Sequence, residues 1–208
     1  MVKMFLKEKL FLIMNNVEFF DMVAPRWDNT NIINERKISH ILDVAEVREG
    51  DSILDVGTGT GVLIPFLEQR IGSGGHIEAV DLSEGMLSVA RSKYPGYGNL
   101  EFVKLDVETD VMSDQFDRIM MYCMFPHLQE PMDTLRWLVG VNLKPGGTLV
   151  IAHAQSRHAI NHIHDRHSPD GTDDLVDIDY FVSLIREHGL TVDYAEDSDE
   201  YYIVRIRA

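Results

Sequence analysis

Three glycines at every second position, Gly57, Gly59 and Gly61, follow a short apolar run that begins at Ile53. Glycine allows the backbone to turn tightly and to approach a ligand without interference from a side chain. A helix that starts after such a turn also directs its first amides at the ligand. A turn between a strand and a helix can need glycine without any ligand, so the pattern by itself leaves a binding turn and a structural turn open.

An acidic residue at the end of the next apolar run favours the binding turn. Asp81 comes about twenty residues after Gly61, at the carboxyl end of a predicted parallel strand, which is the edge where such sheets bind ligands. There its carboxylate can accept hydrogen bonds from both hydroxyls of a ribose. As an isolated residue it could instead cap the helix that begins near Ser83. Together with the glycines, it predicts a site for a nucleoside.

The charge beside the glycines indicates which nucleoside binds. Dinucleotide-binding enzymes use the spacing G-x-G-x-x-G, whereas this chain has G-x-G-x-G with Asp55 just before it. A carboxylate there would repel a pyrophosphate but attract the ammonium group of a methionine moiety. The sequence therefore favours S-adenosylmethionine over NAD.

Four segments resemble, in the same order, the motifs of class I (Rossmann-like) S-adenosylmethionine-dependent methyltransferases. They are Ile53–Gly61, Ala79–Leu87, Phe102–Val107 and Leu143–Leu149. The resemblance covers about residues 34–208 and implies a seven-stranded sheet whose last strand is antiparallel.

The resemblance also implies roles for individual residues. The glycine turn would hold the methionine moiety, Asp81 would bind the ribose, and Asp106 would meet the adenine amino group. Either Leu82 or Met86 would pack on the adenine ring. The cofactor positions implied in this way are Asp55, Gly57, Thr58, Gly59, Gly61, Asp81, Leu82, Met86, Asp106 and Val107.

The order of the elements predicts an α/β fold. From about Asn34 onward, short apolar runs alternate with amphipathic stretches, which is typical of βαβ units and a parallel sheet. The last two strands are too close in sequence for a parallel crossover, so they predict an antiparallel hairpin. The predicted strands are Ser52–Val56, His76–Val80, Leu100–Lys104, Phe116–Tyr122, Gly147–His153, Leu190–Ala195 and Tyr201–Ile206, and the predicted helices are Val62–Ile71, Gly85–Lys93, Met132–Asn142 and Ile178–His188.

We therefore expect a seven-stranded, mostly parallel sheet with an antiparallel last strand and helices on both faces. A helical segment over about residues 1–48 would cap it. By domain, residues 1–33 form an N-terminal extension and lid, and residues 34–208 form the Rossmann-like methyltransferase domain.

The residues after the fourth predicted strand should face the transferred methyl group, because they lie on the same edge of the sheet. His127 is the candidate general base, since an unperturbed histidine has a pKa near neutrality. A histidine that only caps the loop is the alternative. Tyr122 and Cys123 would line the pocket. The segment Glu18–Asp28, which includes Trp27, resembles the lid of ubiquinone- and menaquinone-type methyltransferases, and its aromatic side chains would close over the site, pack on the core, or both.

Five of the nine histidines fall within residues 153–167. If Ser156 caps a helix there, Ile160 and Ile163 mark its buried face, and His164 lies on the same side. A divalent metal could then be held by His127, His153 and His164, with Cys123 or His167 as further candidates.

Two further histidines of this segment, His158 and His162, point away from the buried face by the same periodicity and are expected in solvent. The alternative to a metal site is a polar pocket in which His153 and its neighbours form hydrogen bonds with the substrate.

Composition limits the partners and the compartment. Asp and Glu number 34 against 19 Lys and Arg, giving a net charge of −15, which argues against nucleic acid and anionic membranes as partners. Cys123 is the only cysteine, so a reducing compartment, the cytoplasm, is expected. Residues 1–13 are too short to span a bilayer. They form either a helical extension or an addition before a true start at Met14. We expect a monomer or a homodimer.

Together these observations predict methyl transfer from S-adenosylmethionine to a small-molecule acceptor. The lid indicates a quinone, whereas the histidine-rich segment fits a polar, thiol-bearing or metal-chelating acceptor. The alternative is a non-catalytic module that binds S-adenosylmethionine or a metal as a sensor or partner subunit. An NAD-dependent oxidoreductase is a third possibility, disfavoured by the glycine spacing and Asp55.

Overall fold

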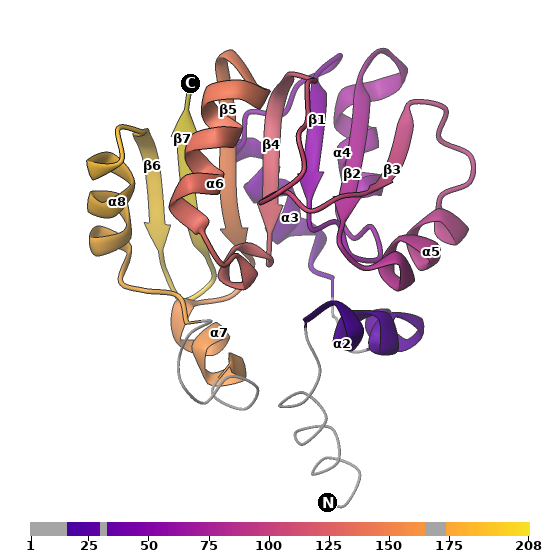
Figure 1. Ribbon diagram of the computed structural model, residues 1–208, viewed down its shortest axis with the longest axis horizontal. Helices are drawn as coiled ribbons and strands as arrows, with labels where there is room; N and C mark the ends of the chain where they lie inside the picture. The colour runs from indigo at the N-terminus through magenta and orange to yellow at the C-terminus, as the bar shows by residue number, and fades with distance from the viewer. Residues whose placement is uncertain (1–15, 30–32, 165–173) are drawn as a thin grey trace, which may run out of the picture.

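Seven strands form one sheet in the order β3-β2-β1-β4-β5-β7-β6 (Figure 1). The computed structural model describes residues 16–29, 33–164 and 174–208, without the side chains of residues 16, 163 and 164. Strands β1 to β5 pair in parallel, and β7 is antiparallel to both β5 and β6. The predicted sheet, including its antiparallel last strand, is confirmed.

Most elements lie within a few residues of their predicted positions. The strands are β1 (Ser52–Val56), β2 (His76–Asp81), β3 (Leu100–Lys104), β4 (Phe116–Tyr122), β5 (Leu143–His153), β6 (Thr191–Asp197) and β7 (Tyr202–Arg207). The helices are α2 (Asn16–Val23), η1 (Ala24–Asn29), α3 (Glu35–Val44), α4 (Ile64–Ile71), η2 (Gly72–Gly74), α5 (Glu84–Lys93), η3 (Phe125–His127), α6 (Pro131–Trp137), the π-helical η4 (Leu138–Asn142), α7 (Arg157–His164) and α8 (Ile178–Glu187).

Side-chain caps fix the beginning of several helices. The Asn34 side chain accepts a hydrogen bond from the third residue of α3, the Ser83 hydroxyl does the same for α5, and the Asp177 carboxylate caps α8. Each cap satisfies an amide that has no partner inside its helix. Ser83 matters most for the site, because it starts α5 two residues after the end of β2.

Two apolar layers bury the two faces of the sheet. One layer, from α6 and α8 against β4, β5 and β7, includes Leu135, Phe181 and Ile185; the other, from α3 and α4, includes Ile41 and Leu67. In Figure 1, α6 and α8 lie in front of the sheet, and α3 and α4 lie behind it. The layers hold the strands so that the carboxyl ends of β1, β2, β4 and β5 share one edge.

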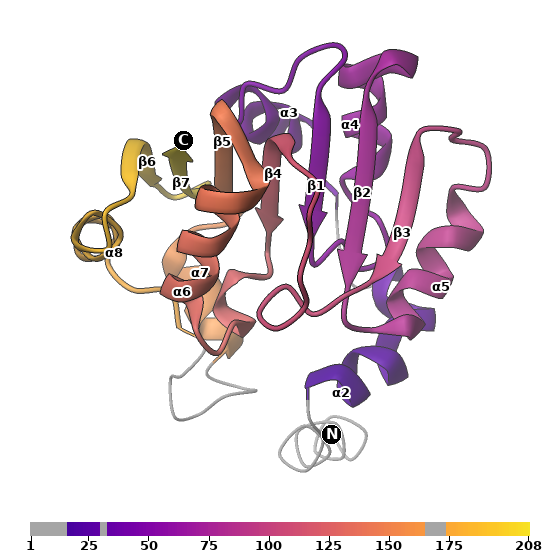
Figure 2. The same cartoon turned by 45° about the horizontal axis from the view of Figure 1, so that its top comes forward.

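The expected N-terminal cap over residues 1–48 is wrong for its last part. Helix α3 lies on a face of the sheet, because Ile38, Ile41 and Leu42 are at most 1% exposed in the layer that it shares with α4. Of the described residues before 48, only α2 and η1 lie beyond the carboxyl edge, on the opposite side of it from α7 (Figures 1 and 2).

Among the described residues, no helix combines the length and the apolar character needed to cross a bilayer.

Candidate active site

The glycine turn after β1 is tight and packs against the loop after β4. Gly57 has a φ of 68° and Gly59 a φ of 56°, a left-handed region that residues with a side chain rarely occupy. A Cβ on Gly57 would lie 2.7 Å from Met124 Cβ, whereas the space around a Cβ on Gly59 is open to 4 Å. Gly57 therefore serves close packing, and Gly59 leaves room for a ligand.

The first three amides of the turn already donate hydrogen bonds inside the protein. The Gly57 and Thr58 amides donate to the carbonyl oxygen of Val80 at 2.9 and 3.0 Å, and the Gly59 amide donates to Asp81 Oδ2 at 2.8 Å. A phosphate needs such donors. The turn thus offers mainly oxygen acceptors to a ligand, which suits a cation and not a pyrophosphate.

Asp55, the last residue but one of β1, is a buried carboxylic acid. It is 2% exposed, and its Oδ2 has no hydrogen-bond partner within the described chain. Burial, and to a smaller extent the nearby charge of Asp81, raises the pKa of Asp55 to about 7. The buried hydroxyl of Thr58 lies beside this carboxyl and partly offsets the rise of its pKa. An unpaired buried carboxyl oxygen such as Asp55 Oδ2 is expected where a ligand completes the site.

Asp81 joins the glycine turn to the start of α5. Its Oδ1 accepts from the Ser83 amide at 2.8 Å, and its Oδ2 accepts from Gly59. Burial raises the pKa of this carboxyl. Asp81 therefore does hold the start of the helix near Ser83, which was the alternative to a binding role. Each of its oxygens keeps a second lone pair for a ligand.

The two candidates for the adenine contact differ in exposure. Leu82 is 41% exposed at the carboxyl edge, while Met86 is 2% exposed inside α5. Leu82 is thus the side chain available to a ring at this edge. Val107, in the turn after β3, is buried, and its neighbour Asp106 is half-buried.

Two aspartates anchor the lid segment, α2 and η1, to these same loops. Asp21 Oδ1 accepts from the Ser83 hydroxyl at 2.5 Å and from the Gly85 amide at 2.8 Å. Asp28 accepts from the Thr60 hydroxyl at 2.5 Å and pairs with Lys93 at 2.7 Å. The hydrogen bonds to Ser83 and Gly85 lower the pKa of Asp21, so this anchor is ionised near neutral pH.

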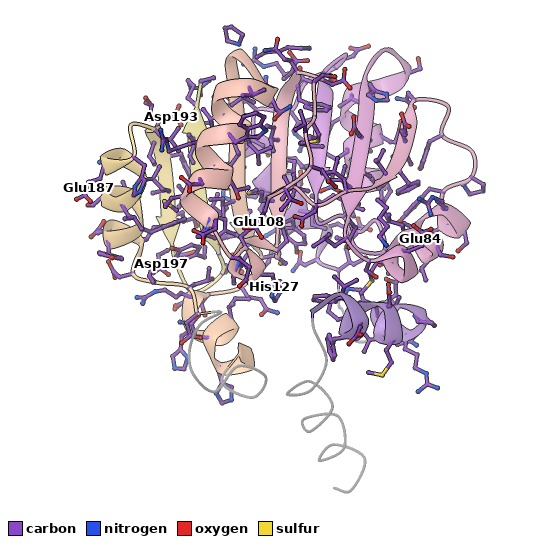
Figure 3. All side chains as sticks on the ribbon, in the orientation of Figure 1. Glu84, Glu108, His127, Glu187, Asp193 and Asp197 are labelled. Atoms are coloured by element: carbon purple, nitrogen blue, oxygen red, sulfur yellow. The ribbon has the colours of Figure 1, made fainter. Side chains whose placement is uncertain are left out.

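Aromatic rings of the lid meet the predicted base. The ring of Phe20 packs edge-on against that of His127, with centroids 5.5 Å apart, and against that of Trp27, at 5.6 Å. Figure 3 shows His127 at the carboxyl edge of the sheet, between α7 and the lid. The structure therefore brings His127 and Trp27 together through Phe20.

The other predicted pocket residues lie at the ends of β4 and β5. Cys123 has a φ of 55°, a left-handed conformation rare outside glycine, and its amide donates to Ala152 at 2.9 Å. Cys123 is exposed to solvent. Tyr122 is half-buried, and burial raises the pKa of its hydroxyl. His153 is 2% exposed, with its ring 6.4 Å from that of Tyr202.

The histidine-rich segment forms α7 as predicted. The Ser156 hydroxyl accepts from the Ala159 amide at 3.3 Å, Ile160 is buried, and His158 and His162 are exposed. The side chains of Ile163 and His164, and the whole of His167, lie outside the described residues. Within the described part of the chain, no three His, Cys, Asp or Glu side chains come together to hold a metal ion. The metal site that includes His164 stays a prediction.

Known proteins of similar sequence and structure are methyltransferases. A family model described as "Methyltransferase domain" matches residues 54–151. The demethylmenaquinone methyltransferase of Clavibacter sepedonicus is 37% identical over 139 residues, which are 64% of this chain and 55% of that protein. The crystal structure of a SAM dependent methyltransferase from Aquifex aeolicus aligns with a TM-score of 0.66 at 27% identity, over 82% of this chain and 88% of that one. Residues 54–151 are thus similar to the methyltransferase-domain family, and the sequence and structure of the chain resemble those of S-adenosylmethionine-dependent methyltransferases.

A more distant methyltransferase shares the whole fold. The N-methyltransferase NodS from Bradyrhizobium japonicum WM9, solved with S-adenosyl-L-homocysteine, has a TM-score of 0.70 over 93% of this chain and 98% of its own, at 14% identity. The chain spans about half the length of the curated methyltransferases that it matches, 55% for the relative from Clavibacter sepedonicus. The predicted resemblance to methyltransferases is confirmed, while the roles of individual residues stay predictions.

Three carboxylates of this candidate site were not predicted from the sequence: Asp21, Asp28 and Glu108. Their partners lie 62, 32 and 21 residues away in the sequence. No local pattern marks an acid whose partner is so distant. The one available signal was the position of Asp21 and Asp28 within the segment that resembles a lid.

Proposed function

We propose that the chain transfers the methyl group of S-adenosylmethionine to a small-molecule acceptor. The observation that carries this proposal is the acceptor-rich glycine turn: its first three amides are already used, and the buried Asp55 carboxyl beside it has a free oxygen. A cationic nucleoside fits these groups better than a dinucleotide. The similarity to S-adenosylmethionine-dependent methyltransferases supports the same cofactor.

Four residues would hold the cofactor. Asp55 would balance the charge of the methionine ammonium group, and Asp81 would accept hydrogen bonds from the ribose through its remaining lone pairs. Leu82 would pack on the adenine, and Asp106 would meet its amino group. When bound, S-adenosylmethionine supplies a methyl group on a positively charged sulfur, which makes the methyl carbon open to attack.

His127 would accept the proton that the acceptor loses as its nucleophilic atom gains the methyl group. The ring of Phe20 covers one side of His127, and the lid anchors at Asp21 and Asp28 keep Phe20 there. A closed lid also excludes water from the site. The protein's own contribution is thus alignment and proton removal.

A reduced quinone or a related aromatic compound is the acceptor class that we favour. The rings of Phe20 and Trp27 offer an aromatic wall beside His127, and a planar ring packs well on such a wall. The names of the curated relatives, which include demethylmenaquinone methyltransferase, support this choice for the matched part of the chain.

The experiment that tests the proposal is a methyl-transfer assay with radiolabelled S-adenosylmethionine and a panel of reduced quinones, catechols and thiols. We expect S-adenosylhomocysteine to form with at least one reduced quinone, and the His127→Gln variant to lose most of this activity while still binding the cofactor. Binding without any turnover across the panel would favour a sensor module. Turnover that is equal in His127→Gln would exclude His127 as the base.

A further inference from the structure

The turn after β3 has a fixed shape that determines where Glu108 points. Asp106 Oδ1 accepts from the Glu108 amide at 3.0 Å, and the Asp106 carbonyl accepts from the Asp110 amide at 2.8 Å. Asp110 Oδ2 accepts in return from the Asp106 amide at 2.9 Å. The turn is also tied to β2, since the Leu105 amide donates to the Asp81 carbonyl at 3.2 Å. A ligand that binds Asp106 would therefore contact the residue whose hydrogen bonds give this turn its shape.

Glu108 extends from this turn to the loop that follows β4. Its Oε1 accepts from the amides of Gln129 at 2.9 Å and Glu130 at 2.7 Å, and its Oε2 accepts from Gln129 at 3.1 Å. These amides stand just before α6, where the partial positive charge of the helix start favours a carboxylate. Glu130, the residue at the N-cap of α6, makes no side-chain capping bond of its own. Glu108 thus supplies from a distant loop the cap that α6 lacks locally.

The loop held by Glu108 is the one that carries His127. His127 is two residues before Gln129, and its amide donates to the Met124 carbonyl at 3.0 Å. Met124 in turn is the side chain that packs on Gly57. In Figure 3 the labelled Glu108 and His127 lie near each other at the carboxyl edge, on two different loops. A shift of the turn after β3 would therefore move the backbone next to His127.

We propose that Glu108 is a positioning residue that sets the His127 loop according to whether the adenine side of the cofactor site is filled. The proposal rests on the proposed function, because it takes Asp106 as an adenine contact and His127 as the base. A cap that served only the stability of α6 would need no link to the Asp106 turn. The geometry points to the coupling role because one carboxylate joins the two loops, and both of its oxygens are used.

The test follows His127 directly and needs no acceptor. The ring signal of His127 is observed by NMR at constant pH, is assigned by its loss in His127→Gln, and is compared without and with saturating S-adenosylhomocysteine. We expect the ligand to shift this signal in the wild type. In Glu108→Ala we expect the dissociation constant of the ligand to stay within about threefold of the wild type, while the shift falls to less than about half. Glu108→Gln, which keeps one acceptor oxygen, should restore part of it.

Two control variants separate coupling from loss of stability. Glu187→Ala makes the same chemical change on the exposed end of α8, far from the edge (Figure 3), and should leave the shift unchanged. Leu135→Ala destabilises α6 from its buried side without touching the Glu108 bonds, and should also keep the shift. If Leu135→Ala loses the shift as Glu108→Ala does, Glu108 acts only through the stability of the helix and the proposal is wrong.

The remaining outcomes are also decisive. A full ligand-induced shift in folded Glu108→Ala would overturn the proposal while leaving the proposed function intact. If Glu108→Ala does not fold, the ligand-induced shift of the His127 signal is measured in Glu108→Gln instead. A shift as large as that of the wild type would then overturn the proposed coupling. If the wild type does not bind S-adenosylhomocysteine at all, the proposed function fails, and this inference fails with it.

Discussion

Replacing Asp55 with asparagine should make the folded protein less sensitive to rising pH and, at the same time, a weaker binder of the cofactor. Burial raises the pKa of the Asp55 carboxyl from 3.8 to about 7. The folded chain therefore keeps the Asp55 proton through a pH range in which the unfolded chain has lost it. The stability from this group is fully present below pH 3.8 and is lost as the pH rises to about 7.

The size of the effect follows from that pKa shift. While the folded state holds one more proton than the unfolded state, each unit by which the pH rises lowers the free energy of unfolding by up to about 1.4 kcal/mol. From about pH 5 to about pH 7.5 the loss from Asp55 is roughly 2 kcal/mol. Urea unfolding of the wild type and of Asp55→Asn at both pH values measures this loss of unfolding free energy. The loss should be absent from the variant, because the asparagine amide does not titrate. Asp199→Asn, on the exposed turn between β6 and β7, is the matched control and should follow the wild type.

The Asp55→Asn variant should also bind the cofactor more weakly than the wild type. Losing a charged hydrogen-bond partner of the ammonium group should cost about 1.5–3 kcal/mol of binding, which is about 10- to 150-fold in the dissociation constant of S-adenosylhomocysteine. A pH dependence of stability in Asp55→Asn equal to that of the wild type would refute the burial argument. Unchanged affinity in the variant would refute the charge argument.

Three further changes test other parts of the site. Gly57→Ala should lower the free energy of unfolding by about 1–3 kcal/mol, because the new Cβ meets a methionine Cβ at 2.7 Å in a left-handed turn; an unchanged Tm would contradict this close packing. Asp81→Ala should weaken S-adenosylhomocysteine binding by about 1–3 kcal/mol in titration calorimetry, and an unchanged Kd would exclude its ribose role. Asp28→Ala removes the bond to Thr60, so trypsin should cleave after Arg26 faster than in the wild type; equal rates by mass spectrometry would show that this anchor does not hold the lid.

The strands and the glycine turn were predictable because their signals are local. Strands β1, β3 and β4 have the predicted bounds, since apolar β-branched runs between turn residues define a buried strand without knowledge of its neighbours. Strand β5 begins four residues earlier than predicted, at Leu143. Pro145 and Gly146 disfavour a strand by propensity, and the pairing of Leu143 with Phe116 across an irregular register extends it nonetheless.

The contacts that complete the site were not predictable, because each joins residues that only the fold brings together. The sequence shows a lid-like segment with acidic residues, but not that Asp21 would meet Ser83 or that Asp28 would meet Thr60. The bond from Glu108 to the amides before α6 depends on where two loops end in space. Helix α3 was assigned to the cap for the same reason, since its apolar stripe gives no sign of which surface it covers.

Titration calorimetry of the wild-type chain with S-adenosylmethionine, S-adenosylhomocysteine and NAD tests whether the glycine turn is a site for a cationic sulfur nucleoside. We expect micromolar binding of both sulfur nucleosides and no binding of NAD. Absence of binding by either sulfur nucleoside, or binding of NAD in their place, would contradict it.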